Sequence, residues 1–114
     1  MPEDQNRLAA DASSVPAEQR RRVLEHPTRR RILRALHRHP EAQTLSELCG
    51  VIPSANTSTV GYHLRMLERG HCVSVVGEIV HGDGVLPTYV SNLADDRAAT
   101  MLLQETRAAD ERDD

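Results

Sequence analysis

The 114-residue chain contains no lysine, no phenylalanine and no tryptophan, and only two tyrosines and two cysteines. With so few aromatic residues, the core must be aliphatic, and the stacked aromatic surfaces that bind single-stranded nucleic acid are disfavoured. Two cysteines are too few for a disulfide scaffold. No run approaches the roughly 20 apolar residues of a membrane-spanning helix. The polar, acidic N-terminus also lacks the apolar segment of a secretory signal. We therefore expect a single cytoplasmic domain with no membrane partner.

Motifs for catalysis and for metal binding are also missing. The chain has no glycine-rich phosphate loop and no G-x-S-x-G sequence, so we expect no enzymatic activity and no catalytic residues. The six histidines do not show the spacing of a zinc site, which needs about four nitrogen or sulfur ligands. We expect no metal and no cofactor. Cys49 and Cys72 are predicted to pack as small apolar residues, with a thiol switch as the alternative.

The charge of the chain is unevenly distributed. The net charge is -3, and all 14 basic residues are arginines. Residues 20–81 carry ten arginines against five acidic residues, whereas the segments on either side are acidic. A basic centre between acidic ends is typical of a face that binds a polyanion, although a solvated helix surface gives the same count.

Hydrophobic periodicity and capping signals divide residues 15–109 into five helices and a hairpin, between an expected disordered arm (1–14) and an acidic tail (110–114). Thr44 and Glu47 fit a capping box, and Asn56 or Thr57 can cap the fourth helix. Gly50 and Gly70 are expected to end the third and fourth helices, respectively. The expected helices cover residues 16–25, 27–38, 45–49, 57–69 and from Asp95 or Asp96 to about Ala109.

The predicted buried positions of the second helix are Ile32, Leu33, Ala35 and Leu36, and those of the fourth are Val60, Leu64 and Leu67. After Gly70 the pattern becomes extended. The runs CVSVVGEIV and VLPTYVSNL predict an antiparallel hairpin with its loop around residues 81–84 and with Pro87 on an edge strand. The last helix has an apolar side that is expected to bind a partner, formed by Ala98, Met101, Leu102, Glu105 and Ala109.

A short helix, a turn and a capped longer helix form a helix-turn-helix, and the trailing hairpin makes it winged. The fold class is therefore mainly α with a β-hairpin wing. Three stretches, HPTRRRILRAL (26–36), LSELCG (45–50) and STVGYHLRMLERGHCV (58–73), together with Tyr89, resemble the ArsR-type winged-helix transcription regulators. The resemblance covers roughly residues 23–93. It implies a homodimer, held by the terminal helices, in which each winged unit reads half of an inverted-repeat operator in double-stranded DNA.

The predicted recognition helix covers residues 57–69, and its face opposite the core is polar. Small hydroxyls at its start can meet phosphates or base edges, and Arg65 can contact guanine bidentately. Gly61 is expected to remove bulk against the groove. Arg29 to Arg31 can flank phosphates, and for His63 a hydrogen-bonding role in the interior is the alternative to base contact. The candidate DNA-binding residues are Thr57, Ser58, Thr59, Tyr62, His63, Arg65, Arg69 and Arg30.

Two features depart from the ArsR pattern. The turn over residues 50–59 is about four residues longer than usual, and the wing tip, HGDG, lacks the basic residues that commonly reach the minor groove. These features favour an alternative function, a winged-helix module that binds a protein and not DNA.

Overall fold

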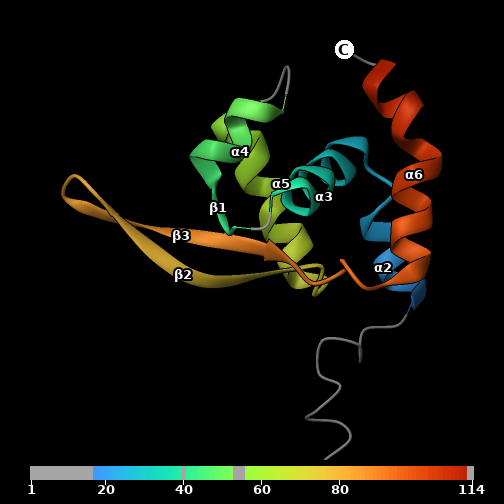
Figure 1. Cartoon of the computed structure of the whole chain (residues 1–114), viewed down its shortest axis with the longest axis horizontal. Coiled ribbons are helices and arrows are strands. Elements are labelled where there is room, and N and C mark those ends of the chain that lie inside the picture. The colour runs from blue at the N-terminus through green and yellow to red at the C-terminus, as the bar shows by residue number, and fades with distance from the viewer. Residues whose placement is uncertain (1–16, 40, 53–55, 113–114) are drawn as a thin grey trace, which may run out of the picture.

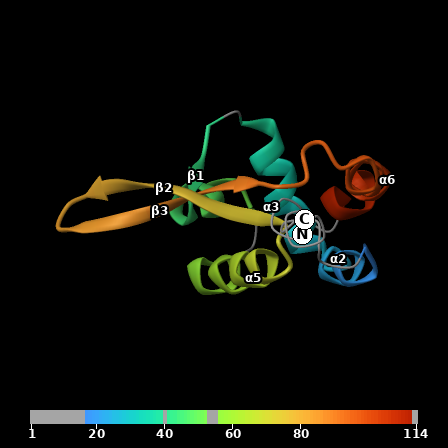
Figure 2. The ribbon, with the colours of Figure 1, turned by 90° about the horizontal axis from the view of Figure 1, so that it is seen from below.

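The structure is a computed structural model that describes residues 17–39, 41–52 and 56–112. Its elements run in the order α2 (Ala17–Val23), α3 (Pro27–Arg38), β1 (Gln43–Thr44), α4 (Leu45–Val51), α5 (Thr57–Arg69), β2 (Val73–His81), β3 (Gly84–Ser91) and α6 (Arg97–Arg112). Helices α3, α4 and α5 form the central group, the β2–β3 hairpin projects to one side, and α2 and α6 lie together on the other (Figures 1 and 2). The predicted winged helix-turn-helix is confirmed.

The core is aliphatic, as the shortage of aromatic residues predicts. All the apolar positions predicted to be buried in the second and fourth helices are buried, and Leu48 of α4 lies between these two helices and the sheet. Tyr89, on β3, is only partly buried and packs against the edge of this cluster. Burial of Leu and Ile side chains contributes about 1.5–3 kcal/mol each. The three central helices are therefore held as one unit that fixes the position of α5.

Three helix boundaries differ from the predictions. The first helix ends at Val23, two residues earlier than expected, and its predicted start at residue 16, like the expected arm 1–14, lies outside the described residues. Helix α4 continues through Gly50 to Val51, so this glycine does not end it. Helix α6 continues to Arg112, and Asp110 is 1% exposed, so the predicted acidic tail begins too early. Helix α6 extends to this point because Asp110 pairs with Arg30 and Arg34 of α3.

The sheet has three strands in the order β1-β3-β2, all antiparallel. The hairpin register joins His81 to Gly84, which confirms the predicted loop, and a bulge lies between Val75 and Gly77. The two-residue strand β1 was not predicted, and it makes β3 the central strand. Pro87 is therefore not on an edge strand. Pro87 pairs with Glu78 of β2. Strand β1 pairs only with Thr88 and Tyr89 of β3, so Pro87 lies just beyond its end. The missing N–H of Pro87 therefore removes no hydrogen bond between strands.

The end of α5 lies close to α2. Gly70 caps α5, as predicted, and a β-carbon at this position would lie 3.0 Å from a methyl carbon of Val23. A larger residue here would push α2 away from the central helices. The short first helix is thus placed against the C-terminal end of α5.

Candidate nucleic-acid interface

Two capped helices, α4 and α5, form the helix-turn-helix. Thr44 Oγ1 accepts a hydrogen bond from the Glu47 amide (3.1 Å), and Glu47 Oε1 accepts one from the Thr44 amide (2.8 Å), which is the predicted capping box. At the start of α5, Asn56 Oδ1 accepts a hydrogen bond from the Thr59 amide (2.8 Å). Of the two predicted caps, the structure therefore uses Asn56. Part of the long turn, residues 53–55, lies outside the described residues.

The outward face of α5 is open to solvent. Tyr62 is 48% exposed, and no acidic residue occurs in α5 before Glu68. Hydroxyl groups occupy the first turn of this helix. The Thr59 amide is used by the Asn56 cap, whereas the first backbone N–H groups of an α-helix have no partner within the helix and can meet a phosphate. Two guanidinium groups follow on later turns. The structure places six of the predicted DNA-binding residues together on this face, and all six are exposed: Thr57, Ser58, Thr59, Tyr62, Arg65 and Arg69.

Gly61 does not lie on the outward face. A β-carbon there would meet Leu45 Cδ2 of α4 at 3.6 Å, and the residue is half-buried. The expectation that Gly61 leaves room for a DNA groove is therefore wrong. The small size of Gly61 allows α4 to pack closely on α5, because the Leu45 side chain of α4 lies against α5 at this position.

His63 is also removed from the interface. Its side chain is 5% exposed, its Nδ1 accepts a hydrogen bond from Arg29 Nε (3.1 Å), and its ring lies 4.2 Å from the ring of His26. Burial, and then the positive charges of His26 and Arg29, lower the pKa of His63 to about 4. His63 is therefore neutral near pH 7, and a neutral ring is required for Nδ1 to accept. The alternative prediction, a hydrogen-bonding role inside the protein, is the one that the structure supports.

Arg29 and His26 position the His63 ring, a role that the sequence patterns did not predict for either residue. Arg29 also donates to the backbone oxygen of Val23 (3.2 Å), so one side chain joins α2, α3 and α5. His26 caps α3 by accepting from the Thr28 amide (3.2 Å). The sequence marks this position with a His-Pro pair before a run of arginines. The contact itself was not predictable from local patterns, because His63 is more than 30 positions away from His26 and Arg29.

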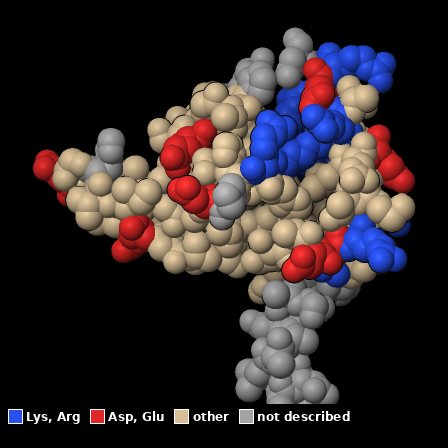
Figure 3. Space-filling view, in the orientation of Figure 1, with Lys and Arg blue, Asp and Glu red and all other residues tan. Residues whose placement is uncertain are grey.

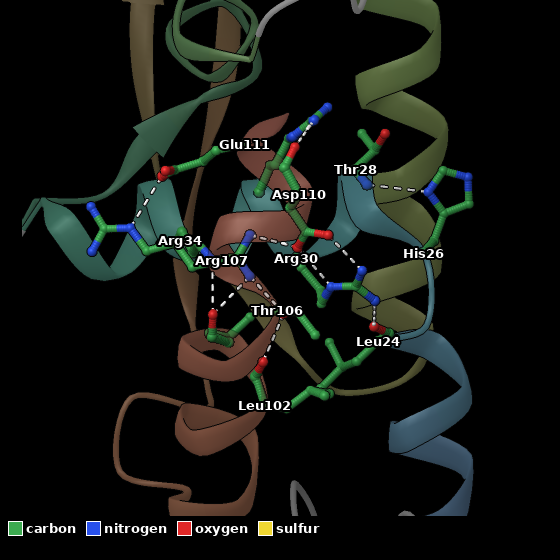
Figure 4. Close-up of polar contacts among 12 residues, drawn as sticks. Leu24, His26, Thr28, Arg30, Arg34, Leu102, Thr106, Arg107, Asp110 and Glu111 are labelled. Atoms are coloured by element: carbon green, nitrogen blue, oxygen red, sulfur yellow. Dashed lines mark hydrogen bonds and ion pairs between the residues drawn. The ribbon is translucent and has the colours of Figure 1, made fainter. Parts of the chain in front are cut away.

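Arg30 binds the C-terminal helix and not a free anion. Its Nε and one terminal nitrogen donate to the two carboxylate oxygens of Asp110 at 2.8 and 2.7 Å (Figure 4). It also donates to the backbone oxygens of Leu24 and Glu25 (2.8 and 2.9 Å), and its side chain is 11% exposed. The prediction that Arg30 contacts DNA is therefore not supported, because its donors are already paired.

Asp110 is the centre of a buried ion cluster. Besides Arg30, its carboxylate lies 2.8 Å from a terminal nitrogen of Arg34, and its backbone oxygen accepts from Arg31. The hydrogen bond from Arg30 is the largest of the effects that lower the pKa of Asp110 below its ordinary value. Arg34 in turn donates to the Leu103 backbone oxygen (2.8 Å). These contacts fix the last turns of α6 on α3.

The basic excess of residues 20–81 is thus partly used inside the fold. Five of its ten arginines donate hydrogen bonds to groups of the chain itself: Arg20, Arg29, Arg30, Arg31 and Arg34. A sixth, Arg22, makes an exposed ion pair with Glu18 at 3.9 Å. Arg20 pairs with Asp96 at 3.0 Å, across the gap between α2 and α6. The prediction that Arg29 to Arg31 flank phosphates is not supported. On the outward face of α5, the exposed positive charge is carried by Arg65 and Arg69.

The wing differs in character from α5. Residues 73–91 contain no arginine, and both acidic residues of the hairpin, Glu78 and Asp83, are exposed. Five of its aliphatic side chains are at least 44% exposed: Val75, Val76, Ile79, Val80 and Val85. Figure 3 shows acidic side chains along the projecting hairpin. The wing therefore offers an apolar and acidic surface, not a basic one.

Helices α2 and α6 enclose an open groove of about 660 Å³. The Asp96 carboxylate caps α6 by accepting from the Ala99 amide (3.0 Å), and Ala99 and Leu103 are buried. The predicted partner-binding face of α6 lines the groove through Ala98, Met101, Leu102 and Glu105. Met101 is 50% exposed. The fifth predicted member, Ala109, is exposed but does not line the groove.

The cysteines lie at different depths. Cys72 is fully buried, and burial raises the pKa of its thiol to about 11. Cys49 is partly exposed, with its sulfur 3.9 Å from the Thr57 hydroxyl. Within residues 17–39, 41–52 and 56–112, no three His, Cys, Asp or Glu side chains are grouped to hold a metal ion. Nor does this part of the chain contain a helix that is long and apolar enough to cross a membrane.

The comparison with protein families agrees with this geometry. A family model described as a helix-turn-helix domain matches residues 24–71, which include α3, α4 and α5 and make up less than half of the chain. No curated protein matches the sequence. The class that the fold and the match define is the helix-turn-helix domain, here with a hairpin wing after α5, and this class indicates a DNA-binding regulator.

Proposed function

We propose that the protein is a homodimeric transcriptional regulator of the ArsR type that binds specific sequences in double-stranded DNA. The observation that carries this proposal is the outward face of α5, where hydroxyls, Tyr62 and two arginines are exposed on a helix whose other face is fixed in the core. A helix of this kind fits the major groove, and Arg65 can donate two hydrogen bonds to the N7 and O6 atoms of a guanine.

The proposed dimer uses the groove between α2 and α6. Its apolar lining, with the exposed Met101, needs a cover. A second copy fits because the lining carries charges of both signs, Glu18 and Glu105 against Arg20 and Arg21, and a two-fold axis brings opposite charges together. Two recognition helices about 34 Å apart would then enter successive major grooves.

Fluorescence anisotropy with DNA from upstream of the protein's own gene tests the proposal. We expect Arg65→Ala to weaken specific binding by about 1–3 kcal/mol, or roughly 5- to 150-fold, with unchanged thermal unfolding. The matched control is Arg22→Ala, because Arg22 lies on α2 with 74% of its side chain exposed and makes only a 3.9 Å ion pair with the similarly exposed Glu18. Equal affinities of wild type and Arg65→Ala would refute the role of Arg65.

The dimer is tested separately by sedimentation. Met101→Glu places a charge in the apolar lining, and we expect it to shift the protein from dimer to monomer. The exposed Ala109, on the same helix but outside the groove, provides the control substitution Ala109→Glu. A Met101→Glu variant that sediments as a dimer would contradict the proposed interface.

The wing favours a second candidate function, a module that binds a protein. Its exposed valines and its acidic residues are poorly suited to a phosphate backbone. A wild-type protein that binds no duplex at low salt, in contrast to the expectation above, would favour this candidate.

A further inference from the structure

A second groove, of about 310 Å³, lies between the C-terminal half of α3 and the middle of α6. Helices α5 and α6 lie on different sides of α3, so this groove is separate from the candidate DNA-binding face (Figure 2). The polar side chains that line it recur at helical spacing on both helices: Arg34, His37 and Arg38 from α3, and Thr100, Gln104 and Arg107 from α6. Basic side chains gather over this region in Figure 3.

No acidic residue lines the groove, and two of its guanidinium groups have donors to spare. Arg38 is exposed and makes no hydrogen bond or ion pair with the described part of the chain. Arg107 uses only its Nε, which donates to Glu111 at 3.1 Å, in a pair whose side chains are 62% and 54% exposed. Guanidinium groups bind carboxylate and phosphate oxygens through parallel hydrogen bonds.

The wall of the groove adds a fixed positive charge. Two buried cations, Arg30 and Arg34, share the single carboxylate of Asp110, and Arg34 is the one of the two that lines the groove. Arg34 is held in place by hydrogen bonds to the Leu103 backbone oxygen and to the Thr106 hydroxyl (2.8 and 2.7 Å). A guanidinium group that is already fixed attracts an anion at little cost in reorganisation.

Neutral groups complete the lining. The Thr100 hydroxyl and the Gln104 amide make no side-chain hydrogen bond within residues 17–39, 41–52 and 56–112. The His37 ring is held at the end of the groove by a 2.6 Å hydrogen bond between Nε2 and the Ser91 hydroxyl. The volume lies at the lower end of the range for small-molecule sites, roughly 300–1,000 Å³.

We propose that this groove binds a small organic dianion whose carboxylate or phosphate oxygens bridge Arg38 and Arg107. The dianion lies over Leu103, with Thr100 and Gln104 as additional donors. The site does not depend on the proposed DNA binding, because none of its residues belongs to α5.

The full chain is titrated with inorganic phosphate and with succinate at constant ionic strength, and binding is followed by calorimetry and by backbone amide chemical shifts. We expect saturable shifts confined to residues 34–38 and 100–107. Arg38→Gln and Arg107→Gln are each expected to weaken binding by about tenfold, the loss of one charge-assisted pair. The control Arg22→Gln removes the same charge from an exposed position on α2 and should bind as wild type does.

Thermal unfolding of each variant shows that it is folded, and because Arg38 and Arg107 are solvent-exposed we expect no change in Tm. Tighter binding of either probe supports the site and identifies the preferred anion. Shifts that grow linearly without saturation, or an equal loss of binding in Arg22→Gln, would show charge screening and overturn the proposal. DNA affinity, measured on the same variants, should stay at the wild-type value. A uniform loss would instead assign the groove to the DNA-binding surface.

Discussion

Replacing Asp110 should destabilise the whole domain, although this residue is only two positions from the end of the described chain. Its carboxylate is 2% exposed and receives two hydrogen bonds from Arg30 and an ion pair from Arg34. Removal of one partner of a buried ion pair costs about 3–5 kcal/mol, because it leaves the opposite charge uncompensated. We expect Asp110→Ala to lower the free energy of unfolding by this amount, and Asp110→Asn, which keeps one acceptor oxygen, by about 2–3 kcal/mol.

The pH dependence of this difference follows from the pKa of Asp110, which its arginine partners lower below the ordinary 3.8. The folded state therefore holds the carboxylate charged to a lower pH than the unfolded state does. The stabilisation is fully present above pH 3.8 and is lost only as the pH falls through the lower pKa of the folded protein. The gap between wild type and Asp110→Asn should stay constant from pH 7 to pH 5 and close only below pH 3.8.

Urea unfolding, followed by circular dichroism, measures both quantities. The control is Glu111→Gln, the neighbouring carboxylate, whose exposed pair with Arg107 is expected to contribute less than about 1 kcal/mol. A loss below about 1 kcal/mol in Asp110→Asn, or a gap that already narrows between pH 7 and pH 5, would refute the reasoning.

Three further predictions concern helix positions and thiols. Burial lowers the pKa of His63 to about 4, so the unfolded chain takes up a proton at this residue before the folded protein does as the pH falls. Between pH 7 and pH 5, wild type should therefore lose about 2 kcal/mol more of its free energy of unfolding than His63→Gln. Urea-unfolding free energies that change with pH in parallel for the two proteins would contradict this. A thiol reagent at pH 8 should modify Cys49 but leave the buried Cys72 intact until the chain unfolds, and two fast-reacting thiols would be inconsistent with its burial. Thr44→Ala should cost about 1–2 kcal/mol in thermal unfolding through the lost capping box, and an unchanged Tm would argue against the cap.

Local patterns were sufficient to predict most of the fold. The apolar spacing of α3 and α5 and the capping box at Thr44 depend on residues within one or two turns, so they can be identified in the sequence. The two-residue strand β1 has no such pattern. It exists because Gln43 and Thr44 pair with Tyr89 and Thr88, more than 40 positions away. Likewise, α6 extends past its predicted end because Asp110 meets α3.

The candidate site divides in the same way. Five of the six exposed candidates on α5, all but Thr59, were predicted from their position opposite the buried seam, which helical periodicity determines. Arg30 and His63 were misplaced because their partners, Asp110 and Arg29, are distant in sequence. An arginine count cannot distinguish a cation that faces solvent from one that a remote carboxylate neutralises.

The most direct test of the central claim, that α5 reads double-stranded DNA as part of a dimer, is selection of bound duplexes from a randomised pool by the full-length protein. We expect enrichment of an inverted repeat whose half-sites lie about 10 base pairs apart, with an affinity that falls steeply as salt rises. We also expect Arg65→Ala to relax the preference at one position in each half-site. A pool that remains unselected at low salt, or a complex that is insensitive to salt, would contradict it.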